Sequence, residues 1–145
     1  MTYKIIKKDL FEMPKDYWFA HCVNATYELG AGIAKTFDEK YNMKYFLRFL
    51  YPQPKDNEAY WVGHALPAGN VFNLVTKVKH YDKPTYESLG IALKDMRRQC
   101  EEYGIKKLAM PKIGCGLDRL DWNRVESMIL NIFNECDIEI VICYL

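Results

Sequence analysis

The chain has 145 residues, half of them hydrophobic and 27% charged, with a formal net charge of +1. This composition is ordinary for a globular protein with a well-developed core, and we expect residues 1–145 to form one domain. The near-zero net charge excludes a general electrostatic attraction to nucleic acids or membrane surfaces, so any contact with a polyanion must come from a local patch.

The cysteines predict a reduced protein without a metal site. They number five, and no two of them show the CxxC spacing of zinc sites or redox motifs. Most lie in apolar surroundings, which favours buried thiols over disulfides. Because the chain also shows no N-terminal leader pattern and no apolar run near ~18 residues, we expect a reducing intracellular location (the cytoplasm, or the nucleus in a eukaryote) and no membrane association.

The first third of the chain predicts two strands and then two helices. Thr2–Lys8 alternates weakly between polar and apolar residues, and Tyr17–Val23 is a short apolar run typical of a central strand buried on both faces. A glycine loop at residues 30–32 then opens a helix with an apolar side from Ile33 to Tyr41. A second, aromatic helical stretch stops at Pro52.

The middle of the chain predicts a hairpin followed by a basic segment. Ala59–Ala65 and Asn70–Thr76 have the composition of strands, and the proline–glycine sequence Leu66–Gly69 between them is typical of a turn. Lys77–Lys83 is rich in basic residues and is bounded by Pro84. A hairpin within an otherwise parallel arrangement would make the sheet mixed.

The last third predicts a helix, a strand, a second helix and a final strand. Apolar residues spaced three and four apart mark a helix from Tyr86 to Tyr103, and Asn123–Asn134 carries a similar stripe. Ile105–Met110 and Ile138–Tyr144 are apolar runs of strand length. Alternating elements of this kind predict an α/β fold with three layers, α/β/α, around a mixed central sheet.

Two glycine loops follow predicted strands and precede predicted helices, at Gly30–Gly32 and at Gly114–Gly116. Ligands of open α/β sheets bind at the carboxyl ends of strands, where such loops offer backbone N–H groups to anions. Neither loop matches the dinucleotide fingerprint or the Walker motif. A diphosphate between the two loops is one interpretation, and a pair of tight connections is the other. Cys115 has no histidine partner specified by position, which favours a small filler over a nucleophile.

Five polar residues at or near strand ends are each compatible with two roles. Asp9 would suit a turn or the recognition of an exocyclic amine, and Asn24 would suit its own turn or a sugar hydroxyl. Lys77 would be solvated or, when deprotonated, would attack a sugar carbon. Asp118 would stabilise its loop or act as a general acid or base. His21 is expected in the core or orienting a ligand.

Taken together, these segments resemble the macro domain family, specifically the branch named for terminal ADP-ribose protein glycohydrolase, also called O-acetyl-ADP-ribose deacetylase. The resemblance extends from about residue 3 to the last two residues. Its most specific part is the long block that ends at Trp122. The segments that carry the resemblance are Asp9-Leu10, His21-Cys22 with Asn24, Gly30–Ala34, Thr76-Lys77, Lys83–Glu87 and Met110–Trp122.

The resemblance implies a macro domain that binds ADP-ribose as ligand or product in a cleft at the strand ends, without a metal or other cofactor. It implies Lys77 as the nucleophile toward C1″ of the distal ribose and Asp118 as its partner acid. It also implies an adenine end and a diphosphate–ribose end of the site. The ligand-binding residues implied in this way are Asp9, Leu10, His21, Asn24, Gly30, Ala31, Gly32, Ile33, Lys112, Ile113, Gly114, Cys115, Gly116, Leu117 and Leu145.

The function implied by the resemblance is removal of ADP-ribose from acyl-linked acceptors, namely ADP-ribosyl-glutamate on proteins or O-acyl-ADP-ribose. Three alternatives stay open: an ADP-ribosyl-thymidine DNA glycohydrolase of antitoxin or anti-defence type, a non-catalytic ADP-ribose reader, and an ADP-ribose 1″-phosphate phosphatase. The residues Asn24–Tyr27 depart from the Asn-Ala-Ala-Asn of the wider family, which favours the lysine-using branch. Expected partners are ADP-ribose, ADP-ribosylated protein or O-acyl-ADP-ribose and, in the second case, ADP-ribosylated single-stranded DNA, bound by a monomer.

Overall fold

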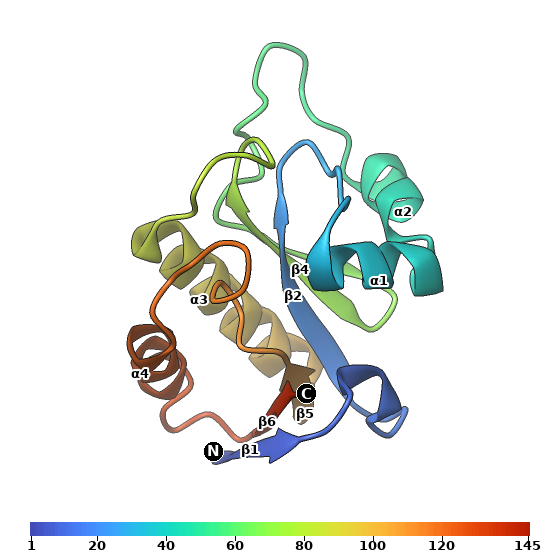
Figure 1. The fold of residues 1–145 in the computed structure, drawn as a ribbon. Helices are drawn as coiled ribbons and strands as arrows, with labels where there is room; N and C mark the ends of the chain where they lie inside the picture. The colour runs from blue at the N-terminus through green and yellow to red at the C-terminus, as the bar shows by residue number, and fades with distance from the viewer.

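The computed structural model describes residues 1–145 as a six-stranded sheet between two layers of helices (Figure 1). The strand order is β1-β6-β5-β2-β4-β3. The strands are β1 (Thr2–Lys7), β2 (Trp18–Asn24), β3 (Ala65–Ala68), β4 (Val71–Lys77), β5 (Lys107–Met110) and β6 (Glu139–Tyr144). Every neighbouring pair is parallel except β3 and β4, which are antiparallel, so the predicted mixed sheet and three-layer α/β/α class are confirmed.

Two helices cover each face of the sheet, and a short 3-10 helix, η1 (Leu10–Glu12), follows β1. Phe37 and Leu47 of the first two helices belong to one buried cluster, whereas Leu93 and Ile129 of the other two belong to a second. Strand β2 contributes to both clusters, as its predicted burial on both faces requires. The helices are α1 (Gly32–Tyr41) and α2 (Met43–Leu50) on one face and α3 (Tyr86–Tyr103) and α4 (Trp122–Ile132) on the other.

The hairpin lies further along the chain than predicted. Residues 59–63 form turns rather than a strand, and β3 is instead Ala65–Ala68, which takes in most of the predicted turn Leu66–Gly69. Pro67 is tolerated there because β3 is an edge strand, where a missing N–H removes no ladder hydrogen bond. The true turn is the pair Gly69–Asn70, in which Gly69 adopts a φ of +59°.

The parallel strands β5, β2 and β4 are neighbours, so their carboxyl ends lie side by side at one edge of the sheet. Met110, Asn24 and Lys77 are the residues at these three ends. Strands β1 and β6 end at the same edge, where the Lys8 amide donates to the Tyr144 carbonyl at 2.8 Å. Segments far apart in the sequence therefore meet at this edge. No helix is both long and apolar enough to cross a membrane.

Candidate active site

A cavity of about 800 Å³ opens at the carboxyl ends of β2, β4 and β5. Its volume falls within the range of small-molecule sites in proteins. The walls come from three connections: the loop between β2 and α1, the loop between β4 and α3, and the loop between β5 and α4. Each connection carries residues that the sequence marked as site candidates.

The first wall is the N-terminus of α1. Ala31 is its N-cap residue, and no side chain caps the helix. The first N–H groups of a helix have no intrahelical partner and carry the positive end of the helix dipole. Gly30 and Ala34 also line the cavity. The combination makes this wall suited to an anion.

The second wall is the loop between β5 and α4. Gly114 has a φ of +73°, where a side chain is strained, and a Cβ atom there would lie 2.9 Å from Cδ1 of Leu120, which would have to shift. The Leu120 amide donates to the Gly114 carbonyl at 2.7 Å and closes the turn. A Cβ atom on Gly32 would lie 3.4 Å from Cδ1 of Leu117. The two glycine loops thus approach each other across the cavity.

The most reactive arrangement in the cavity is the ion pair between Lys77 and Asp118. The Nζ atom of Lys77 lies 2.6 Å from Oδ1 of Asp118, and the two side chains are only 14% and 17% exposed. The same ammonium donates to the His80 carbonyl at 3.1 Å. A lysine held in this way can supply an amine nucleophile, and the adjacent carboxylate can accept or return its proton.

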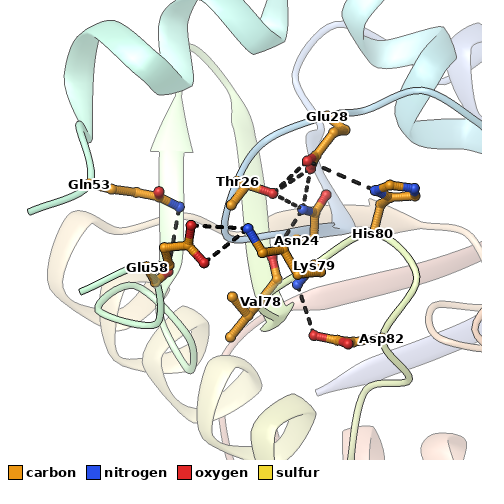
Figure 2. A network of polar contacts seen from close by, with 9 residues as sticks. All are labelled: Asn24, Thr26, Glu28, Gln53, Glu58, Val78, Lys79, His80 and Asp82. Carbon is orange, nitrogen blue, oxygen red and sulfur yellow. Dashed lines mark hydrogen bonds and ion pairs between the residues drawn. The ribbon is translucent and has the colours of Figure 1, made fainter. Parts of the chain in front are cut away.

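Asn24 lies beside this pair, because it is the ladder partner of Lys77 after a register shift between Val23 and Asn24. Its side chain lines the cavity and is nearly buried. The Nδ2 group donates to Thr26 Oγ1 at 2.7 Å, to the Val78 carbonyl at 3.1 Å and to the Glu28 carboxylate (Figure 2). Asn24 is therefore held from outside the cavity by its neighbours.

The cavity brings together both proposed catalytic residues, Lys77 and Asp118, and most of the implied ligand-binding residues. Those that line it are Asn24, Gly30, Ala31, Gly32, Ile33, Lys112, Ile113, Gly114, Gly116 and Leu117.

Three implied residues, Asp9, Leu10 and Leu145, lie beyond the cavity at the ends of β1 and β6. The Asp9 carboxylate accepts from the Phe11 amide at 3.0 Å and caps η1, while Leu10 is buried. Leu145 is exposed. The Nζ atom of Lys112, which lines the cavity, lies 5.1 Å from the Tyr144 ring centre and so joins the cavity to this region.

His21 does not line the cavity, and the structure places it in the core. Its Nε2 atom lies 2.6 Å from Oδ1 of Asn73, and its ring stacks on Phe37 with 4.0 Å between ring centres. Burial lowers the pKa of His21 to about 4, so the ring is neutral at physiological pH. Direct contact with a ligand is not available to it in this arrangement.

Cys115 also does not line the cavity. Its Sγ atom donates to the Ile113 carbonyl at 3.2 Å, and burial together with the nearby Asp121 raises the pKa of the thiol to about 11. Cys22 does line the cavity, but burial and the nearby Asp118 raise its pKa as well. Thiolates, the reactive form, are therefore disfavoured at both positions. All five cysteines are free.

Several further residues around the mouth of the cavity were not among the implied ligand-binding residues. The sequence marks His80 and Lys83 only as possible phosphate contacts of the basic segment, and it assigns no individual role to Tyr81, in the same segment, or to Arg119, in the block that ends at Trp122. Lys79 of the same segment pairs with Glu58 at 2.9 Å instead of lining the cavity. No three or more His, Cys, Asp or Glu side chains are arranged to hold a metal ion. The additional lining residues are Cys22, Val23, Leu29, Ala34, His80, Tyr81, Asp82, Lys83, Pro111 and Arg119.

Comparison with known proteins places these features in a family. The family model described as the Macro domain matches residues 20–129. A human protein named ADP-ribose glycohydrolase OARD1 is 39% identical over 137 residues, which cover 94% of this chain and 88% of that protein. The macrodomain of Mycobacterium tuberculosis DarG has the same fold, with a TM-score of 0.82 at 21% identity over 99% of this chain and 98% of that one. Thermosipho africanus DarTG, solved in complex with ADP-ribose, gives a TM-score of 0.76 at 17% identity over 98% of this chain and 41% of that one.

Proposed function

This chain belongs to the macro domain family, and we propose that it is an ADP-ribosyl hydrolase that removes ADP-ribose from acyl-linked acceptors. The acceptors would be glutamate side chains of proteins or the acyl group of O-acyl-ADP-ribose. One observation carries the proposal: the enclosed pair of Lys77 and Asp118 lies within a cavity that the two glycine loops help to wall. The similarity to ADP-ribose glycohydrolase OARD1 over most of both chains supports it.

We propose that ADP-ribose lies along the carboxyl edge of the sheet. The diphosphate would accept hydrogen bonds from backbone N–H groups at the start of α1 and in the loop between β5 and α4. The distal ribose would then lie beside Asn24 and Lys77. The adenosine would extend past Lys112 toward Asp9 and Leu145, where β1 and β6 end.

The proposed chemistry begins with proton transfer from the Lys77 ammonium to the Asp118 carboxylate across their 2.6 Å contact. The neutral amine attacks C1″ of the distal ribose, and the bond from C1″ to the acyl oxygen breaks. Asp118 returns its proton to the departing acyl group, which leaves as a carboxylic acid. The product is a covalent adduct between C1″ and the lysine nitrogen.

Water completes the proposed cycle. Asp118, again a carboxylate, deprotonates a water molecule that attacks C1″, and the bond from C1″ to the lysine nitrogen breaks. ADP-ribose leaves, and the proton held by Asp118 returns to the amine, which restores the resting pair. Holding C1″ against the amine can contribute roughly 7–11 kcal/mol to lowering the barrier.

The test is release of ADP-ribose from a glutamate-modified protein by wild type, Lys77→Ala and Asp118→Ala. Both variants are expected to lose turnover, while Lys79→Ala, which removes a neighbouring cation outside the cavity, is expected to keep it. Full turnover by Lys77→Ala would refute the lysine mechanism. Tight binding of ADP-ribose without any turnover would indicate a reader, and phosphate release from ADP-ribose 1″-phosphate would indicate a phosphatase.

A second candidate, removal of ADP-ribose from thymidine in single-stranded DNA, is favoured by the charge around the mouth of the cavity. Lys83, Arg119 and Lys112 form no ion pair in the structure, and the Tyr81 ring is 74% exposed. Unpaired cations beside an exposed aromatic ring suit phosphates flanking a stacked base. Thymidine-modified DNA should therefore be assayed beside the modified protein, with the salt dependence of binding as a second readout.

A further inference from the structure

Glu28 lies next to the cavity without lining it, and neither the sequence patterns nor the proposed chemistry gives it a role. Its carboxylate accepts hydrogen bonds from the Thr26 hydroxyl at 2.7 and 2.6 Å and from the Asn24 side-chain amide (Figure 2). The His80 ring nitrogen Nδ1 lies 3.9 Å away on the other side. Although partial burial opposes ionisation, the bonds from Thr26 and Asn24 hold the pKa of Glu28 below its ordinary value.

These acceptors determine which way the Asn24 amide points. A carboxylate only accepts hydrogen bonds, and so does the Val78 carbonyl, which Asn24 Nδ2 also approaches at 3.1 Å. The NH₂ end of Asn24 must therefore face Glu28 and Val78. Its oxygen, Oδ1, makes no hydrogen bond within the protein and is not fully buried, so it is the end available to the cavity.

The backbone around Glu28 is held in an uncommon conformation. Tyr27 and Leu29, on either side, have φ values of +54° and +46°, which non-glycine residues seldom adopt. Both are buried, and the Tyr27 hydroxyl donates to the Tyr51 carbonyl at 2.9 Å. Burial of the two flanking side chains thus presents Glu28 to Asn24 from a fixed position.

We propose that Glu28 is a positioning residue: together with Thr26 it orients Asn24 so that Oδ1 accepts a hydrogen bond from a hydroxyl of the substrate's distal ribose. The proposal rests on the function proposed above, because Asn24 is the ladder partner of Lys77 and a ribose at one lies beside the other. Correct placement of the ribose brings C1″ to the amine, while the diphosphate and adenosine provide most of the binding.

Because Asn24 places the ribose while other groups provide most of the binding, a change at Glu28 should affect kcat more than affinity. Glu28→Gln replaces an acceptor by a group that is half donor, which allows Asn24 to turn its NH₂ toward the cavity. We expect kcat to fall about 10- to 100-fold, with KM and the Kd for ADP-ribose within about threefold of wild type. In an Asn24→Ala background, Glu28→Gln should lower kcat less than about twofold, because the amide that Glu28 orients is no longer present.

Matched variants separate positioning from a merely structural role. Thr26→Val should resemble Glu28→Gln and Thr26→Ser should restore activity, which also keeps the test informative if Glu28→Gln folds poorly. Glu58→Gln is the control, because it makes the same change at another glutamate of Figure 2, which pairs with Lys79 outside the cavity. An unchanged kcat in Glu28→Gln, or a loss that persists in full in the Asn24→Ala background, would overturn the proposal.

One readout does not depend on turnover. In ¹⁵N-labelled protein the Asn24 side-chain NH₂ signals, assigned by their absence in Asn24→Ala, should be shifted by their bonds to a carboxylate. They should move toward ordinary values in Glu28→Gln but not in Glu58→Gln. Unmoved signals would refute the orientation by Glu28 even if the enzyme proved inactive. Wild type and Lys77→Ala, assayed in parallel, test the proposed function separately.

Discussion

The enclosed ion pair between Lys77 and Asp118 should contribute both to the stability of the fold and to catalysis. Three variants test it: Lys77→Ala, Asp118→Ala and the double variant. Each single change leaves one charge in a site where the side chains are only 14% and 17% exposed. After Lys77→Ala the carboxylate has no cation, and after Asp118→Ala the ammonium keeps only the His80 carbonyl.

The magnitude follows from the enclosure of the pair. Removing one partner of a fully buried ion pair costs about 3–5 kcal/mol. Because both side chains keep some exposure, we expect each single variant to lose about 2–3 kcal/mol of unfolding free energy. The double variant leaves no unpaired charge, so its loss should be smaller than the sum by about 1–3 kcal/mol.

Urea unfolding of the three variants measures the coupling energy between Lys77 and Asp118. Turnover of ester-linked ADP-ribose by the same variants shows whether the two residues act together in catalysis. If the two residues act as a unit, the double variant should be no less active than Lys77→Ala. The control is the same cycle on the more exposed pair of Lys79 and Glu58, with an expected coupling of about 0–1 kcal/mol. A coupling energy between Lys77 and Asp118 as small as that of the control pair would refute the enclosed ion pair. If the double variant instead lost activity by the product of the two single losses, the shared mechanism would be refuted.

Three further predictions concern the scaffold of the site. Burial lowers the pKa of His21 to about 4 in the fold, whereas an exposed histidine in the unfolded chain titrates near 6.5. The free energy of unfolding should therefore be fully retained above pH 6.5 and fall by about 3 kcal/mol as the pH drops to 4, and His21→Gln should remove this pH dependence in urea titrations. Gly114→Ala should destabilise by about 2–4 kcal/mol and weaken ADP-ribose binding in calorimetry, because φ is +73° and Leu120 lies 2.9 Å from the added atom. Thr85→Ala should cost about 1 kcal/mol in thermal unfolding, because Thr85 Oγ1 accepts from the Ser88 amide and caps α3.

Much of the fold was predictable because its signals are local. The stripe from Tyr86 to Tyr103 and the apolar run of β2 identify their elements without knowledge of their neighbours. The hairpin was misplaced because Pro67 and Gly69 together are typical of a turn, whereas an edge strand accepts the proline and leaves the turn to Gly69 and Asn70. Edge position is a property of the sheet, and it cannot be read from a short segment.

The glycine loops of the site were predictable for the same local reason, but the partnership of Lys77 and Asp118 was not predictable from spacing. The two residues are 41 positions apart in the sequence. Taken alone, Lys77 is compatible with a solvated lysine and Asp118 with a residue that stabilises its own loop. Their contact depends on the sheet order β5-β2-β4, which places the ends of β4 and β5 on either side of β2. Only the resemblance to a family linked them at the level of sequence.

Glu28 shows why a stable loop beside the cavity can still escape prediction. Two positive φ values at non-glycine residues cost about 1–3 kcal/mol each, and nothing in the sequence around Tyr27 marks them. Tyr27 and Leu29 are only 2% and 4% exposed, and burial of such side chains contributes about 1.5–3 kcal/mol each, which offsets the strain. The loop can therefore hold Glu28 against Asn24 before a ligand arrives. The free-energy cost of ordering the Asn24 side chain then does not reduce the affinity for the ligand. This pre-organisation is what the strained segment contributes to the role proposed for Glu28.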